Sequence, residues 1–232
     1  QSDARIHDIY HAVPPQNVRA GAFILSNVAP YFPAGTVHCV VIDPGVGTDR
    51  RAIAVEADDQ YFVGPDNGVL VPPARELSDN NEIEVYNVPY DDETESNTFH
   101  GRDVFAPAAA SIAEGGDFRD NPIDDYVDLN IDFYGAEFDG STARAEVVYV
   151  DRFGNVITDL EGGKVLERAD YGDVIHVNRS HLPFEDTYAR VPEGKPLCTV
   201  GSHGNFEVSV NQGSGSKALS LEAGDEVEIE IE

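Results

Sequence analysis

The chain has 232 residues, of which 41 % are apolar, so it is long enough for one large domain or two modest ones and too apolar for disorder. Its 43 acidic residues against 15 lysines and arginines give a formal net charge of −28, which argues against nucleic acid and anionic membranes as partners. Because there is no run of about 18 apolar residues and no basic-then-apolar leader, we expect neither a membrane-spanning helix nor a secretory signal.

The acidic residues are spread over the whole chain. We interpret this as adaptation to a high-salt, halophilic cytoplasm, where salt screens the self-repulsion of the surface. The alternative is an acidic face that recruits a cationic partner. Cys39 and Cys198 lie far apart in apolar runs, which predicts buried free thiols in a reducing compartment. A cytoplasmic protein is therefore expected.

Hydrophobic patterning in the first half of the chain predicts a mixture of helices and strands. Strands are expected at 6–13 and 52–57, a strand buried on both faces at 37–43, a strand and turn at 61–68, and helices at 17–32 and 103–115. Pro30 should end the first helix, and Gly115-Gly116 should end the second. We therefore predict an N-terminal α/β domain, residues 1–116, with a central, mostly parallel sheet flanked by helices.

From residue 145 the pattern changes to short strands separated by Gly, Asn and Asp turns. Strands are expected at 145–150, 155–160, 173–177, 196–200, 205–210 and 226–231, with little helix. This predicts a smaller all-β C-terminal domain, residues 145–232, arranged as an antiparallel barrel or sandwich. The acidic stretch 117–144 is predicted to be a linker.

A glycine-containing run, DPGVGTDRR at 43–51, follows the predicted strand 37–43. Open α/β sheets bind ligands at the carboxyl ends of strands, and glycines let backbone approach a ligand closely. The run also begins like the loop with which methyltransferases bind S-adenosyl-L-methionine (SAM). That interpretation fails because Asp49 occupies the third glycine position and too few residues follow Thr48 for a crossover helix. A plain glycine turn is the structural alternative.

Three further motifs carry polar residues on predicted loops. His100, in the run TFHGRD at 98–103, precedes a predicted helix and could transfer protons near neutrality or simply brace a turn. The tip DRFGN at 151–155 and the run GSHGNFE at 201–207, followed by NQGS at 211–214, could bind a ligand or form ordinary hairpins. His7 and His11 have the spacing of a zinc helix but lie in a predicted strand, so no metal site is expected.

Taken together, six blocks in one order resemble the SAM hydroxide adenosyltransferases, or SAM hydrolases, which are relatives of fluorinating and chlorinating SAM enzymes. The blocks are GAFILSNVAPYFPAGTVHCVVIDPGVGTDRRAI, YFVGPDNGVL, TFHGRDVFAPAAA, YVDRFGNVITDL, TYARVPEGKPL and GSHGNFEVSVNQGS. The resemblance implies an N-terminal α/β domain and a smaller C-terminal β domain. It also implies a homotrimer whose SAM sites lie between the N-terminal domain of one subunit and the C-terminal domain of a neighbour.

The resemblance also assigns residues. It places the catalytic residues of the family on Asp43, Arg50 and His100. The substrate-binding positions that it implies are Asp151, Phe153, Asn155, Tyr188, Ser202, Glu207 and Asn211. A halide pocket excludes a carboxylate because a buried negative charge repels the anion, so Asp43 argues against halogenation.

One family feature is missing from this chain. Members begin with a strand and a Thr-Asp-Phe-Gly-like loop whose aspartate holds the ribose hydroxyls, whereas this sequence opens on Gln1-Ser2-Asp3. Either the first segment is missing from this sequence or the protein has lost a ribose contact. We favour a missing segment, because loss of the first strand would expose a sheet edge.

The resemblance predicts a hydrolase that splits SAM with water into adenosine and L-methionine by substitution at ribose C5′. SAM is then a substrate, and no cofactor or metal is expected. The residues leave open whether Asp43 or His100 takes the proton from water. The alternatives are a protein that binds SAM or adenosine without turnover, and a SAM-dependent halogenase.

Overall fold

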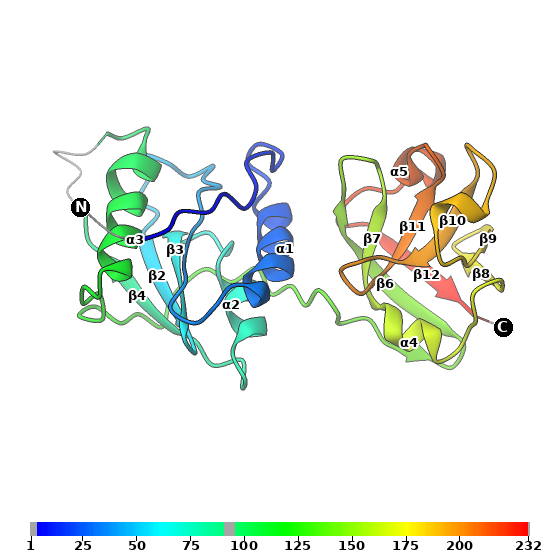
Figure 1. Ribbon diagram of the computed structural model, residues 1–232, viewed down its shortest axis with the longest axis horizontal. Helices are drawn as coiled ribbons and strands as arrows, with labels where there is room; N and C mark the ends of the chain where they lie inside the picture. The colour runs from blue at the N-terminus through cyan, green and yellow to red at the C-terminus, as the bar shows by residue number, and fades with distance from the viewer. Residues whose placement is uncertain (1–3, 91–95, 232) are drawn as a thin grey trace. The chain divides into compact units, whose positions relative to one another are not determined.

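The computed structural model describes residues 4–90 and 96–231, and the opening residues Gln1, Ser2 and Asp3 lie outside that range (Figure 1). The chain divides into two compact units, Gln1–Ile131 and Asp132–Glu232. The boundary falls within the stretch 117–144 that was predicted as a linker. Both ends of that stretch are bonded into a unit: Ile123 N donates to Val85 O at 2.8 Å, and Ala136 N donates to Asp159 O at 3.2 Å. The predicted limits 1–116 and 145–232 stay predictions.

The first unit contains a four-stranded mixed sheet. Its order is β1-β3-β2-β4, with β1 (Val37–Cys39), β2 (Ala52–Ala57), β3 (Gln60–Pro65) and β4 (Glu84–Val88). Only β1 and β3 pair in parallel, whereas β2 pairs antiparallel with both β3 and β4. The expectation of a mostly parallel sheet is therefore wrong for the described strands. The cause is a two-residue turn, Asp58-Asp59, which can join only antiparallel strands.

The helices of this unit begin and end at recognisable residues. The side chain of Asn17 accepts a hydrogen bond from Ala20 N and caps α1 (Val18–Val28), which gives way to a 3-10 turn containing Pro30. A π-turn at Gly101–Phe105 leads into α3 (Ala106–Ala113), which ends before Gly115 in the left-handed conformation. Both predicted helices are confirmed, while α2 (Val71–Leu77) and β4 were not predicted.

Helices contact both faces of the sheet (Figure 1). Ala52 and Ala54 of β2 pack in one cluster with Phe105, at the end of the π-turn, and with Ile112 of α3. Because neighbouring residues of a strand point to opposite faces, the equally buried Ile53 points to the other face. The strand that is buried on both faces is therefore β2, and not the run 37–43 for which this burial was predicted.

Two expectations about the start of the chain are wrong. Residues 6–13 form no strand and are mostly exposed, so the predicted strand there is absent. The predicted strand 37–43 is regular only over β1, and Cys39 and Val41 are exposed rather than buried. The reason is that β1 lies at the edge of the described sheet, with β3 on one side. Of the two free thiols, only Cys198 is buried.

The second unit is a nearly closed antiparallel barrel-like sheet in the order β10-β11-β7-β6-β12-β8-β9, with β5 paired to β6. A bridge between Phe184 and Cys198 brings the end of β9 next to β10. The strands are β5 (Phe138–Asp139), β6 (Thr142–Val150), β7 (Val156–Glu161), β8 (Val174–Val177), β9 (Ser180–Pro183), β10 (Pro196–Val200), β11 (Asn205–Val210) and β12 (Glu226–Glu230). The six strands predicted after residue 145 are confirmed, and β9 was not predicted.

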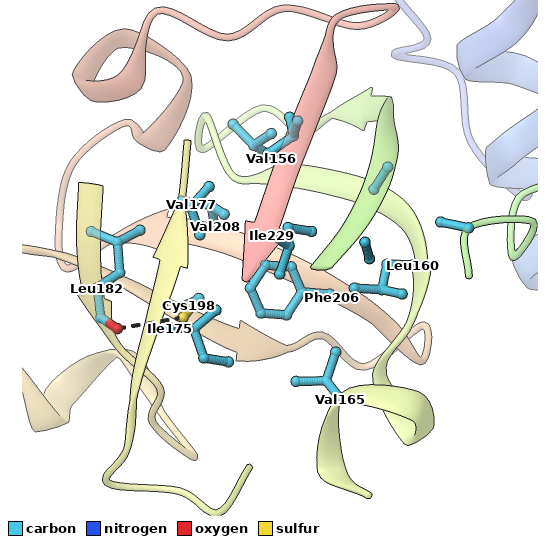
Figure 2. Close-up of a cluster of buried hydrophobic side chains, with 14 of the residues drawn as sticks. Val156, Leu160, Val165, Ile175, Val177, Leu182, Cys198, Phe206, Val208 and Ile229 are labelled. Atoms are coloured by element: carbon cyan, nitrogen blue, oxygen red, sulfur yellow. Dashed lines mark hydrogen bonds between the residues drawn. The ribbon is translucent and has the colours of Figure 1, made fainter. Parts of the chain in front are cut away.

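The interior of this sheet is a single apolar cluster (Figure 2). Phe206 lies within it, surrounded by residues such as Leu160, Ile175 and Ile229. Two short helices, α4 (Gly162–Leu166) and α5 (Gly215–Leu219), join the strands, in keeping with the small helix content expected. Among the residues that the structure describes, no helix has the length and apolarity needed to cross a bilayer.

Candidate active site

Asp43 and Arg50 form a two-bond ion pair in the loop after β1. Arg50 Nε donates to Asp43 Oδ1 at 2.9 Å, and Arg50 Nη2 donates to Asp43 Oδ2. Only 9 % of the arginine side chain and 6 % of the aspartate side chain are exposed. A bidentate guanidinium–carboxylate pair fixes both orientation and distance. The loop 43–51 is thus built around a charge pair, which a plain glycine turn would not require.

His100 completes this cluster from a distant part of the chain. Arg50 Nη2 donates to His100 Nδ1 at 2.8 Å, across 50 positions of sequence. Because a guanidinium only donates, Nδ1 is the acceptor and the ring proton lies on Nε2. His100 is 2 % exposed. The structure therefore brings together all three residues for which a catalytic role was predicted.

Two aromatic rings that sequence reasoning missed pack against the cluster. The Arg50 guanidinium lies 5.0 Å from the centre of the buried Phe105 ring. The Tyr90 ring lies 5.0 Å from the His100 ring, and its hydroxyl is 3.5 Å from Arg50 O. These rings restrict the rotamers of Arg50 and His100. Phe105 could have been suspected, because it lies in the block TFHGRDVF, whereas Tyr90 lies outside every block.

Gly47 allows the loop to approach the segment that carries His100. Its φ of +76° is in the left-handed region, and a Cβ at this position would lie 2.5 Å from Asn97 O. Any other residue would push the loop away from the segment 97–100. The glycines of this motif were predicted to let backbone approach a ligand, and Gly47 instead lets two parts of the chain approach each other.

In the second unit, the run 151–155 forms a turn, and the side chain of Asp151 braces it. Its Oδ1 accepts from Phe153 N at 2.8 Å and from Asn155 N at 2.9 Å, and its Oδ2 accepts from Asn155 Nδ2 at 2.9 Å. Phe153 points outward and is 62 % exposed. A Cβ on Gly154 would lie 2.2 Å from Ser214 Oγ, so this turn lies against the segment that follows Asn211.

Glu207 is the centre of a second polar cluster in that unit. The residue is 3 % exposed, and its carboxylate accepts from Tyr188 Oη at 2.8 Å and from Ser209 Oγ at 2.5 Å. His203 Nε2 lies 3.4 Å from its other oxygen. Burial alone would raise the pKa of Glu207, but the hydrogen bonds from His203, Ser209 and Tyr188 together lower it. Burial and the charge of Glu207 raise the pKa of Tyr188.

The remaining predicted positions have different surroundings. Ser202 is exposed at the tip of the turn between β10 and β11. Asn211 Nδ2 donates to Val191 O at 2.7 Å, which ties it to the end of the 3-10 turn at Tyr188–Arg190. Ser209 and His203 were not predicted. Ser209 could have been found, since it lies two residues after Glu207 and therefore on the same face of β11.

Sequence comparison shows the family of this chain. The model of the SAM hydroxide adenosyltransferase N-terminal domain matches residues 1–121, and that of the C-terminal domain matches residues 145–228. The chain belongs to the SAM hydroxide adenosyltransferase family. The resemblance stated on the six sequence blocks is thereby confirmed.

Named relatives are similar over nearly the whole chain. An (R)-S-adenosyl-L-methionine hydrolase of Salinispora tropica is 40 % identical, covering 97 % of this chain and 86 % of its own length. A protein of the same name from Thermus thermophilus is 41 % identical over 94 % of this chain and 84 % of its own. A fluorinase of Actinopolyspora mzabensis is 23 % identical over 98 % of this chain and 87 % of its own. The chain is thus closer to these hydrolases than to this fluorinase.

Solved structures share the fold. An uncharacterised conserved protein from Thermotoga maritima superimposes with a TM-score of 0.84 at 36 % identity, covering 98 % of this chain and 89 % of its own. A conserved hypothetical protein from Thermus thermophilus has a TM-score of 0.74 at 35 % identity, covering 96 % of this chain and 85 % of its own.

The described residues contain no group of three or more His, Cys, Asp or Glu side chains arranged to hold a metal ion. Arg50 is the positive group next to the Asp43 carboxylate.

Proposed function

We propose that this protein hydrolyses S-adenosyl-L-methionine to adenosine and L-methionine, and that the (R) sulfonium epimer is a substrate. The observation that carries the proposal is that Asp43, Arg50 and His100 form one bonded cluster, although His100 lies 50 positions after Arg50 in the sequence. The names of the hydrolase relatives at about 40 % identity support the choice of substrate and epimer.

The proposed reaction is a substitution at ribose C5′. The oxygen of water forms a bond to C5′ while the C5′–S bond breaks, and the bonding electrons stay on sulfur. The sulfonium becomes the neutral thioether of methionine, so the leaving group needs no acid. The protein must therefore aim the water and accept its proton, and aim alone can contribute up to about 7–11 kcal/mol. No cofactor or metal enters this scheme.

We assign the proton to Asp43 rather than His100. Arg50 occupies Nδ1 of His100 and the Nε2 proton makes the other nitrogen a donor, so the neutral ring has no free acceptor in this arrangement. Each oxygen of Asp43 accepts one hydrogen bond from Arg50 and keeps a second acceptor site. His100 then orients the water through Nε2–H, while the two bonds from Arg50 hold the Asp43 carboxylate in position to accept the proton.

The residues of the second unit are proposed to bind the substrate. In this proposal Asp151, Phe153 and Asn155 contact the methionine portion and the adenosine. Tyr188 stacks on adenine, and Ser202, Glu207 and Asn211 contribute from neighbouring loops. The depressed pKa of Glu207 supports a permanent negative charge there, which suits a ligand with an ammonium and a sulfonium group.

We further propose a cytoplasmic homotrimer in which each SAM site combines residues of two subunits. The support is that the candidate residues are divided between the two units of the chain. The first-unit cluster is assigned the chemistry, and the second-unit residues are assigned substrate binding.

Halogenation is the second candidate reaction, because a fluorinase is among the relatives. The Asp43 carboxylate disfavours it, since a negative charge at the nucleophile site repels a halide. A binding protein without turnover is the third candidate, and the geometry of the triad disfavours it.

The experiment is a chromatographic product assay with (R)-SAM and (S)-SAM in chloride-rich buffer. Adenosine should form with the wild-type chain, at a rate that falls about tenfold or more in Asp43→Asn and in His100→Ala. Wild-type rates in both variants would remove the triad from the mechanism. A 5′-chloro nucleoside as main product would make the protein a halogenase. No product from either epimer, together with measurable binding of SAM, would make it a binding protein.

A further inference from the structure

Asn67, in the turn after β3, is bonded to the residue before Asp43. Its Nδ2 donates to Ile42 O at 2.8 Å, and its Oδ1 accepts from Val69 N at 3.2 Å. The side-chain amide thus closes its own turn with one atom and holds the backbone next to Asp43 with the other. The side chain of Ile42 is held as well, because it packs where Gly21 of α1 has no Cβ.

Asp66, the preceding residue, is bonded to the residue after Arg50. Arg51 Nε donates to Asp66 Oδ2 at 2.9 Å, and Arg51 Nη2 lies 2.7 Å from the same oxygen. The other carboxylate oxygen accepts from Val127 N at 2.8 Å. Only 3 % of the Asp66 side chain is exposed. This ion pair, whose carboxylate is buried while Arg51 is partly exposed, fixes the backbone from which Arg50 extends.

Two consecutive residues of one turn therefore brace both ends of the loop that carries the proposed catalytic pair. Asp66 N also donates to Arg51 O at 2.9 Å, and the Tyr90 hydroxyl lies 3.5 Å from Arg50 O. Two further bonds lie within the loop, from the Thr48 hydroxyl to Gly45 O and from Val46 N to Asp43 O. Internal bonds of this kind shape a loop but do not place it in the fold. The turn 66–67 places the loop in the fold, because this turn continues directly from the central strand β3.

We propose that Asp66 and Asn67 are positioning residues for SAM hydrolysis, setting the distance at which Asp43 and Arg50 meet the water and His100. This inference rests on the proposed function. Neither side chain needs to touch substrate. Displacing catalytic groups by about 1 Å can cost about 100-fold in rate without preventing substrate binding.

Isosteric variants test this in the full chain. Asn67→Asp keeps the acceptor for Val69 N but removes the donor to Ile42 O, and Asp66→Asn keeps the acceptor for Val127 N but removes the charge facing Arg51. Asn67→Ser is a milder second variant, since serine can close the turn but is too short to reach Ile42. Asp125→Asn is the matched control, because Asp125 is an exposed partner of the same Arg51 side chain.

For SAM, kcat should fall about tenfold or more in Asn67→Asp and Asp66→Asn, while KM changes by less than about threefold. Asp125→Asn should keep the wild-type kcat. A general loss of stability would instead lower the fraction of active enzyme, which titration of active sites reports. Unchanged kcat in all three turn variants, or an equal loss in Asp125→Asn, would overturn the inference.

Amide hydrogen exchange gives a readout that does not depend on activity. The amides of Val46 and Thr48 should exchange faster than in wild type in the three turn variants, Asn67→Asp, Asn67→Ser and Asp66→Asn. Their exchange rates should be unchanged in Asp125→Asn. If the wild-type chain released no adenosine, the proposed function would fail while this exchange difference could still show the brace. Unchanged exchange in every turn variant would refute the brace itself.

Discussion

Arg50 Nη2 and His100 Nδ1 lie 2.8 Å apart, with the arginine donating to the histidine. The same guanidinium holds both oxygens of Asp43, so a single side chain sets the position of the other two. Arg50 is therefore the residue whose geometry, rather than charge alone, should matter most.

Arg50→Lys tests this dependence on shape. Lysine keeps the charge but has one nitrogen, so it cannot bond Asp43 through two atoms and reach His100 as well. We expect kcat to fall about 100-fold, with a smaller effect on KM, in steady-state assays of adenosine release. Arg119→Lys is the control, since Arg119 also forms a two-bond pair, with Glu56, away from the cluster. Equal rates for Arg50→Lys and wild type would contradict the geometric role.

Gly47→Ala should reduce both stability and activity. A residue with a β-carbon is less stable by roughly 1–2 kcal/mol in the left-handed backbone conformation. The close contact of that Cβ with Asn97 O destabilises the folded state further. Gly35→Ala is a matched control, because Gly35 has a similar φ of +83° with nothing near its missing Cβ. Urea unfolding should show a lower free energy of unfolding in both variants, and the rate of adenosine release should fall only in Gly47→Ala. Full activity in Gly47→Ala would show that the loop does not need its close approach to residue 97.

His38 makes stability depend on pH. It is buried, and its Nε2 lies 2.6 Å from Gln60 Oε1. Burial lowers its pKa below the ordinary 6.5, and the Gln60 hydrogen bond only partly offsets this. The unfolded chain therefore binds the proton at a higher pH than the folded chain. The free energy of unfolding should thus be undiminished above about pH 6.5 and decline as the pH falls below it.

Urea unfolding at about pH 7.5 and about pH 5.5 measures this effect. The loss of stability between the two values should shrink in His38→Gln and stay unchanged in His181→Gln, which alters an exposed histidine. The same loss in wild type and His38→Gln would assign the acid sensitivity to other groups.

Tyr188→Phe should weaken adenosine binding while leaving the ring in place. Phenylalanine can stack on adenine but cannot donate to Glu207, so its orientation is less fixed. A hydrogen bond of this kind contributes about 0.5–1.5 kcal/mol, which corresponds to a dissociation constant raised about twofold to twelvefold. Calorimetry with adenosine measures it, and Tyr171→Phe, at another tyrosine of the same unit, is the control. An unchanged dissociation constant would remove Tyr188 from the proposed binding site.

Much of the fold follows from local sequence signals. Alternating residues and turn formers located six strands of the second unit, and Pro30 and Gly115 marked where helices end. The parallel sheet was mispredicted because the run 37–43 is apolar without being buried. The turn Asp58-Asp59 carries no glycine or asparagine, so it gave no hairpin signal although it decides the sheet direction.

The cluster that we propose to be catalytic was predictable from family motifs, but its supporting residues were not. Asp43, Arg50 and His100 lie in recognisable runs, and their meeting depends on Gly47, whose importance only the approach to Asn97 reveals. Tyr90 and Phe105 act through packing across the fold, which no local pattern encodes. Asp66 and Asn67 were visible as turn formers, while their partners Arg51 and Ile42 lie on another segment.

The claim that water is the nucleophile can be tested by incubating the wild-type chain with (R)-SAM in ¹⁸O-labelled water and analysing the products by mass spectrometry. The account predicts one ¹⁸O atom in adenosine, at the 5′ oxygen, and none in methionine. Adenosine without the label, or a halogenated nucleoside in its place, would contradict it.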